Sequence, residues 1–251
     1  MKHGLLLTVS LALTACSAPR IEATPEYGKM RMSGEFAIAT AGVASTNDLK
    51  DLGLDDEEGT PGARVDLKWG LPHLSFSVSK FDTSGSGTTT ADLSQGAVTI
   101  PAGTNVDSDV ELIYGNAILT FDFVPGDTVE VGLGFGVEAA SLQTSVKPSA
   151  GGAGVDTDES VPIPVLALRA GVDLGSFQVD GLLTGIKAGY SGDDLTFYDL
   201  DLRARWEVFD HAHLLLGYKR WTVDLEYDDG ADNVALDVTA DGPYLGFVLA
   251  F

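Results

Sequence analysis

Pro243-Tyr-Leu-Gly-Phe-Val-Leu-Ala-Phe251, at the end of the chain, is the stretch that decides the fold. Its largest apolar residues recur at every second position, namely Leu245, Phe247, Leu249 and Phe251. Because successive side chains of a β-strand point to opposite faces, these side chains share one face. Chain ends usually fray into solvent, so an apolar strand that runs to the last residue is unusual in a soluble domain. The stretch predicts a β-strand with one strongly apolar face in a setting unusual for a soluble domain, with an ordinary core strand of a soluble domain as the alternative.

The same period of two continues through most of the chain. Large apolar residues alternate with Gly and Glu from Val129 to Glu138, and with charged residues from Tyr198 to Val208. This period predicts strands rather than helices. Strands are expected at 29–41, 64–69, 74–79, 109–123, 129–138, 161–174, 177–190, 198–208, 214–227 and 234–251.

Three long polar segments separate some of these strands. Residues 45–62, 82–108 and 147–160 are rich in Asp, Gly, Ser and Thr, which predicts exposed loops. A small hairpin is expected around Val98 to Ile100. Within 109–123 the apolar residues change phase, so a β-bulge is expected near Gly115. Long polar connections thus alternate with short, tight turns.

This order of elements predicts an all-β fold, an antiparallel up-and-down transmembrane β-barrel of about ten strands, with eight or twelve as alternatives. An even number of strands returns both termini to the same side. Trp69, Tyr198, Trp206 and Trp221 are expected near strand ends, as in the aromatic girdles of membrane interfaces.

The terminal stretch resembles the last strand of bacterial outer-membrane β-barrels, and residues 198–251 are similar to the closing hairpins of small barrels of the OmpA and OmpW type. In such barrels the assembly machinery reads the final aromatic residue and the alternating apolar residues before it. The resemblance implies that Leu245, Phe247, Leu249 and Phe251 form an assembly signal. It also implies outer-membrane lipids and the barrel-assembly machinery as partners, with periplasmic termini and extracellular long loops.

The amino-terminal residues read as an export signal. A short charged start is followed by an apolar run, which is too short for a transmembrane helix. Leu13-Thr-Ala-Cys16 resembles the lipobox of bacterial lipoproteins, and Cys16 is the only cysteine in the chain. We therefore expect a signal peptide at 1–15, a lipidated linker at 16–27 and the barrel at 28–251. The alternative is an ordinary signal peptide that is cleaved after Ala15 or Ala18.

The composition narrows the range of partners. The formal net charge is −22, so the chain is not expected to bind nucleic acid through a basic patch. No cofactor is expected. Acidic clusters in the polar segments suit divalent cations such as calcium, although none has the full spacing of a calcium-binding loop. Asp156, Asp158 and Glu159 are the candidate metal ligands.

Charged residues on the polar faces of the strands are expected to fill the lumen. A barrel of about ten strands has a narrow interior, so charges of both signs can pair across it. The glycines from Gly132 to Gly136 are the only feature that favours open space. The residues expected to face the lumen are Arg31, Glu35, Arg64, Asp66, Lys68, Glu130, Arg169, Asp173, Asp201, Arg203, Arg205 and Glu207.

A catalytic role is not expected. An Asp-His or Ser-His-Asp site of a surface enzyme needs a histidine near the outer rim. His3 lies in the signal peptide, and His73, His211 and His213 lie in predicted periplasmic turns. The predicted function is a structural, surface-interaction or loop-display barrel with a plugged lumen. A narrow channel for small solutes or ions and a soluble lipocalin-like lipoprotein are the alternatives.

Overall fold

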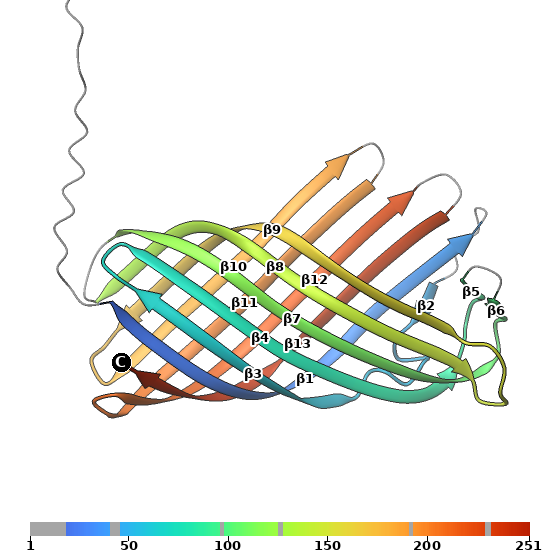
Figure 1. Cartoon of the computed structure of the whole chain (residues 1–251), viewed down its shortest axis with the longest axis horizontal. Helices are drawn as coiled ribbons and strands as arrows, with labels where there is room; N and C mark the ends of the chain where they lie inside the picture. The colour runs from blue at the N-terminus through green and yellow to red at the C-terminus, as the bar shows by residue number, and fades with distance from the viewer. Residues whose placement is uncertain (1–18, 41–45, 96–97, 125–127, 191–192, 229–231) are drawn as a thin grey trace, which may run out of the picture.

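Ten long antiparallel strands form a closed ring in the computed structural model, which describes residues 19–40, 46–95, 98–124, 128–190, 193–228 and 232–251 (Figure 1). Each long strand pairs with the next, and β13 pairs with β1 to close the barrel. This confirms the predicted fold class. The long strands are β1 (Arg20–Thr40), β3 (Glu57–Lys68), β4 (Pro72–Thr88), β7 (Asn105–Val124), β8 (Val129–Pro148), β9 (Val155–Asp173), β10 (Phe177–Tyr190), β11 (Asp193–Phe209), β12 (Ala212–Asp228) and β13 (Asp232–Ala250).

Both ends of the described chain lie at one end of the barrel, which we call the terminal end. The Phe251 amide donates a hydrogen bond to the Ile21 carbonyl at 2.9 Å. β1 already begins at Arg20, so the prediction that residues 20–27 belong to a linker is wrong. This segment pairs with both β3 and β13, and its Glu22 and Thr24 side chains are buried inside the barrel. Cys16 and the predicted signal peptide lie outside the described residues.

The opposite end, here the distal end, differs from the predicted loops. Large parts of 45–62, 82–108 and 147–160 continue the strands β3, β4, β7, β8 and β9. Neighbouring strands offer these Gly, Ser, Thr and Asp residues backbone partners, and this pairing outweighs their weak strand propensity.

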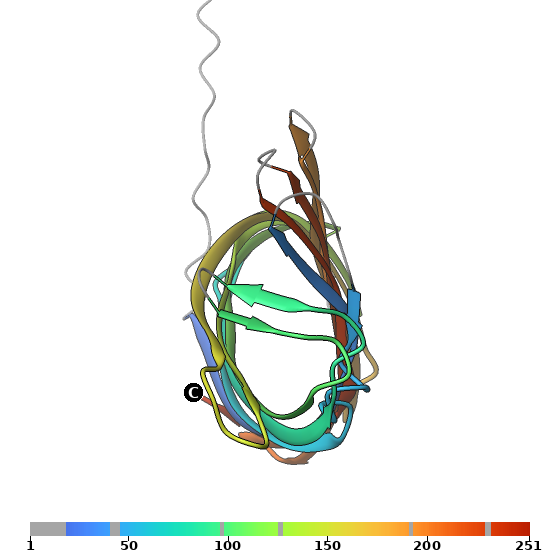
Figure 2. The same ribbon diagram turned by 90° about the vertical axis from the view of Figure 1, so that its right-hand side faces the viewer.

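Three short strands complete the distal end. β2 (Thr46–Asp48) pairs with β1, while β5 (Leu93–Gln95) and β6 (Val98–Ile100) form the hairpin that the sequence predicts. Figure 2 shows this hairpin crossing the mouth of the barrel, and β5 contacts both β1 and β9. Within the described residues, no helix is long and apolar enough to cross a membrane.

β7 explains the change of phase in the apolar pattern. Its pairing with β4 continues without interruption through Gly115, so the bulge predicted there is wrong, and an irregularity lies instead between Asp122 and Val124. Even-numbered residues face the interior from Val106 to Asp122. Near the distal end these are apolar, as at Leu112, and near the terminal end they are polar, as at Thr120. The hydrophobic residues change face while the backbone keeps its register.

The interior therefore has two tiers. The distal tier is an apolar cluster that includes Met30, Leu112 and Val165, together with Leu93 and Ile100 of the β5–β6 hairpin. The tier toward the terminal end holds buried charged residues. The glycines at 132–136 leave little room there, because a Cβ on Gly132 would lie 2.8 Å from Asp122 Oδ1.

On the outer surface the apolar and polar zones are reversed relative to those of the interior. Nearest the terminal end the outer surface carries a belt of exposed large apolar side chains, which is the surface that a transmembrane barrel presents to lipid. Trp69 and Trp206 are exposed in this part, whereas Trp221 is buried and stacks on Tyr114, so its predicted place in a girdle is wrong. The belt includes Phe76, Val78, Phe121, Phe123, Val129, Leu133, Phe135, Val137, Leu166, Leu168, Leu202, Leu214, Leu216, Leu245, Phe247, Leu249 and Phe251.

Candidate functional site

The charged tier is organised around Asp180 of β10. Arg203 Nε lies 2.7 Å from Asp180 Oδ2, and Arg205 Nη2 lies 2.8 Å from Asp180 Oδ1. Arg205 also reaches across the barrel to Glu22 of β1, at 2.6 Å. All four side chains are buried. Because a buried charge is tolerated only when it is paired and hydrogen-bonded, these contacts depend on one another.

Two further ion-pair groups extend this network around the barrel. Arg64 of β3 pairs with Asp201 of β11 and, at 3.1 Å, with Glu26 of β1. Tyr244 of β13 donates a hydrogen bond to the other oxygen of Asp201 at 2.5 Å. Gly217 gives the tyrosine its space, because a Cβ there would lie 2.2 Å from Tyr244 Cζ.

The second group involves Arg169 of β9. It pairs with Asp122 of β7 at 2.7 Å and with Glu130 of β8 at 3.1 Å, and Lys68 of β3 also pairs with Glu130. These contacts connect four strands near the terminal end. The ion pairs thus cross the interior between strands on several sides of the barrel.

The structure places most of the predicted lumen residues in or near this network. Arg64, Asp66, Arg169, Asp201, Arg203 and Arg205 are buried in the interior. Lys68 and Glu130 are partly exposed, and Asp173 and Glu207 line an open concavity at the terminal end.

Two of the predicted lumen residues point away from the interior. Arg31 and Glu35 are exposed, because Met30 and Met32 occupy the interior face of β1. Arg31 pairs instead with Asp55 at 3.3 Å. The prediction is wrong here because the distal part of β1 passes the apolar tier, where polar residues face outward.

Several interior groups were missing from the predicted set. For Asp199 the signal was present, since it shares the alternation of Asp201 and Arg203 on β11. Asp180 lies on a strand with a weak pattern, and only its pairing with Arg203 reveals its role. The interior charged residues that the prediction omitted are Glu22, Asp122, Glu138, Asp180, Asp199 and Lys219.

The described histidines lie at or near the terminal end. His73 is buried beside Asp66, with Nε2 3.4 Å from Oδ1, and Ser75 donates a hydrogen bond to the same carboxylate oxygen at 2.7 Å. In a catalytic triad the serine would instead contact the histidine. His211 and His213 line the concavity at the terminal end. None of the described histidines is near the distal end.

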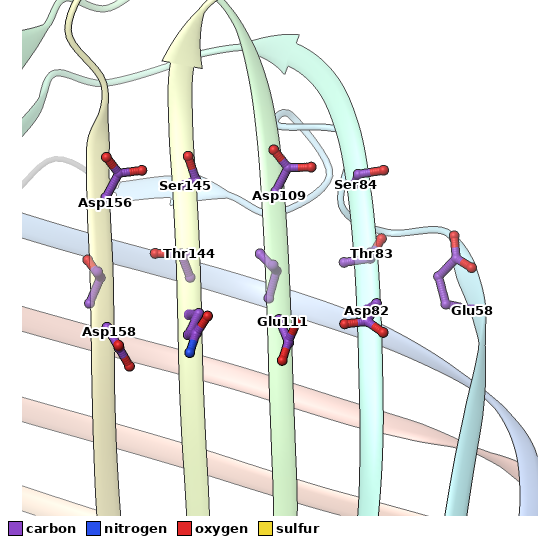
Figure 3. Close-up of a pocket in the computed structure, with 13 residues that line it drawn as sticks. Glu58, Asp82, Thr83, Ser84, Asp109, Glu111, Thr144, Ser145, Asp156 and Asp158 are labelled. Carbon is purple, nitrogen blue, oxygen red and sulfur yellow. The ribbon is translucent and has the colours of Figure 1, made fainter.

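An acidic concavity of about 680 Å³ is formed by β3, β4, β7, β8 and β9 near the distal end (Figure 3). Lys80 lies at its edge, 3.3 Å from Asp82 and 3.1 Å from Glu111. The hydrogen bond that the Lys80 ammonium donates to Glu111 is the main cause that raises the pKa of Lys80. The carboxylates that line the concavity are Glu58, Asp82, Asp109, Glu111, Asp156 and Asp158.

Two of the three candidate metal ligands, Asp156 and Asp158, therefore lie in this concavity. The side chain of Glu159 lies outside the described residues. Within the described part of the chain, no three His, Cys, Asp or Glu side chains are arranged to hold a metal ion. Cation binding at these residues stays a prediction.

Comparisons with known proteins give matches in structure only. No protein-family model matches the chain, and a search of curated protein sequences finds no match. The outer membrane protease OmpT from Escherichia coli is similar with a TM-score of 0.62 at 11% identity, over 92% of this chain and 97% of that one. OprG from Pseudomonas aeruginosa matches at a TM-score of 0.39 and 12% identity, over 94% and 96% of the two chains. Ail from Yersinia pestis matches at 0.35 and 12%, over 92% and 99%.

At such identities the likeness concerns the fold, and of these three matches the one to OmpT has a TM-score high enough to support an argument. That match covers nearly the whole ring of strands described above. Together with the exposed apolar belt, it identifies the chain as having the fold of a small bacterial outer-membrane β-barrel protein.

Proposed function

We propose that this protein is an outer-membrane barrel with a closed lumen and a structural or surface-interaction role. The carrying observation is the stack of interior layers, in which the ion-pair network, the apolar tier and the β5–β6 hairpin follow one another along the barrel axis. A soluble lipocalin-like barrel would be apolar inside and polar outside at every height. The exposed apolar belt opposes that alternative.

The proposed orientation has the terminal end in the periplasm and the distal end outside the cell. The belt supports this orientation because it lies nearest the terminal end and leaves a polar part of the barrel beyond the membrane at the distal end. The acidic concavity would then face the exterior. The proposal includes no catalytic role, since the described histidines are remote from that exposed end.

The first test is conductance. In planar bilayers the purified barrel is expected to show only rare, small openings, because the buried Arg and Asp side chains are mutually paired and occupy the interior. A variant in which a short glycine linker replaces the β5–β6 hairpin should remain equally silent, since the ion-pair network is intact. Large, steady conductance of the wild-type barrel would instead establish the alternative, a narrow channel.

We also propose that Cys16 is lipidated, on the basis of Leu13-Thr-Ala-Cys16 and the lack of any other cysteine. Metabolic labelling with palmitate should mark the wild-type protein and leave Cys16→Ala unlabelled. Equal labelling of the two proteins would rule out lipidation at this residue.

A further inference from the structure

Two buried carboxylates share one phenol between the charged tier and the apolar tier. Tyr114 Oη of β7 lies 2.5 Å from Glu138 Oε2 of β8 and 2.7 Å from Asp199 Oδ2 of β11. The exposed fractions of these residues are 4%, 1% and 3%. Bulk water therefore does not reach these side chains, so the side chains themselves supply the protons of the two short contacts.

The two short contacts of Tyr114 need two protons if both are hydrogen bonds. With both carboxylates ionised, the phenol would supply only one. A phenol has a single proton and can donate it to one carboxylate only. The other short contact then joins two oxygens without a proton, unless a carboxylic acid donates to the phenol oxygen. Thr184 already donates to the second oxygen of Glu138, at 2.7 Å. Asp199 Oδ1 is buried and accepts no hydrogen bond within the described structure.

The charges around Glu138 and Asp199 also indicate that one proton is bound. From β12, Lys219 Nζ lies 3.4 Å from Asp199 Oδ2 and 4.6 Å from the centre of the Tyr114 ring. This single ammonium faces two carboxylates, so the cluster would carry one uncompensated negative charge in the interior. One bound proton removes that charge.

Other nearby charged groups are already engaged. Asp201, also on β11, is held by Arg64 of β3 and by the hydroxyl of Tyr244 on β13. Arg64 is shared with Glu26 of β1, so it is not free to compensate Glu138 or Asp199. From β10 the cluster is faced by Thr184, which is uncharged.

We propose that Glu138 and Asp199 form a proton-binding site that holds one proton at neutral pH and keeps the boundary between the two tiers closed. When this proton leaves, two negative charges face one phenol, and the strands that carry them are pushed apart. The presence of the proton follows from the local contacts alone. The control of closure rests in addition on the proposed closed lumen, so the two parts are tested separately.

Infrared spectroscopy of the whole barrel in detergent at neutral pH tests the proton directly. The carbonyl stretch of a buried protonated carboxyl is separate from the bands of ionised carboxylates. We expect this band in the wild type and its loss in Glu138→Gln and in Asp199→Asn, because the remaining carboxylate then pairs with Lys219 and Tyr114. Glu26→Gln, which changes another interior carboxylate, is the matched control and should keep the band. Absence of the band from the wild type would overturn the proposal, and a metal cation bound in place of the proton would give this result. Persistence of the band in both variants would overturn the proposal as well.

The pH dependence of stability gives a second readout. The folded barrel holds this proton at neutral pH, whereas the unfolded chain releases it once the pH exceeds the range in which carboxyl groups ordinarily titrate. The site therefore makes the folded state less stable as the pH rises. Between about pH 5 and pH 7 the ratio of folded to unfolded protein should fall about tenfold per pH unit more steeply in the wild type than in Glu138→Gln, because one proton is involved. Equal slopes would contradict the proposal.

Conductance separates this inference from the proposed function. Openings that increase at alkaline pH in the wild type, but not in Glu138→Gln, support control of closure by the proton. Steady conductance at every pH, with the infrared band present, would refute the closed lumen and its control and leave the proton-binding site intact. A silent barrel at every pH with the band present would refute only the control of closure.

Discussion

Asp180→Asn is expected to lower the free energy of unfolding by about 3 to 5 kcal/mol, the range for breaking a buried ion pair from one side. The substitution keeps the size of the side chain and removes the negative charge that Arg203 and Arg205 share. Arg205 would retain Glu22, and Arg203 would retain only a longer contact of 3.5 Å with Asp66. Two adjacent buried guanidinium groups would then be undercompensated. Denaturant unfolding in detergent micelles measures the change.

The exposed pair between Lys80 and Asp82 provides the control for this experiment. Both side chains are largely in solvent, where ion pairs contribute little because water screens them. Asp82→Asn should leave the unfolding midpoint unchanged. A second comparison uses the double variant Asp180→Leu with Arg203→Met, in which apolar side chains replace both partners and should recover part of the loss. A neutral effect of Asp180→Asn would mean that the interior network does not hold the barrel together.

Most of the fold can be predicted from the alternating pattern of apolar and polar residues. The alternation in β8 and β11 is strong enough to predict each strand and its two faces, and the ring of ten follows from the order of strands and turns. The polar extensions of β4 and β7 could not be predicted in this way. Their Gly, Ser and Thr residues become strands only because a partner strand lies beside them.

The interior site was less accessible to sequence reasoning, because alternation specifies a face and not a height along the barrel. The rule of a polar inside and an apolar outside holds for β11 from Tyr198 to Trp206. It fails nearer the distal end, where Phe197 of β11 and Met30 and Met32 of β1 face the interior. The meeting of Tyr114, Glu138 and Asp199 depends on the pairing registers of β7 with β8 and of β10 with β11. A period of two leaves these registers undetermined.

Leu133→Arg tests the height of the lipid-facing belt and is expected to cost about 2 to 4 kcal/mol, the range for a cation near the middle of the hydrocarbon layer. Leu133 is 55% exposed and lies midway along the part of β8 whose outward side chains are apolar, from Val129 to Val137. In a soluble barrel the same substitution would be an ordinary exposed arginine with almost no effect. Folding of the wild type and of Leu133→Arg into lipid vesicles, followed by urea titration, measures the difference in folding free energy.

Gln143→Arg is the matched control, because it lies on the same strand and points to the same outer side beyond the belt. Its arginine would stand in water near the carboxylates of the acidic concavity, so the folding free energy should stay close to that of the wild type. An equal loss of stability in both variants would show that the membrane reaches farther toward the distal end. No loss in Leu133→Arg would mean that this face of β8 does not meet lipid, and the proposed membrane position of the barrel would fail.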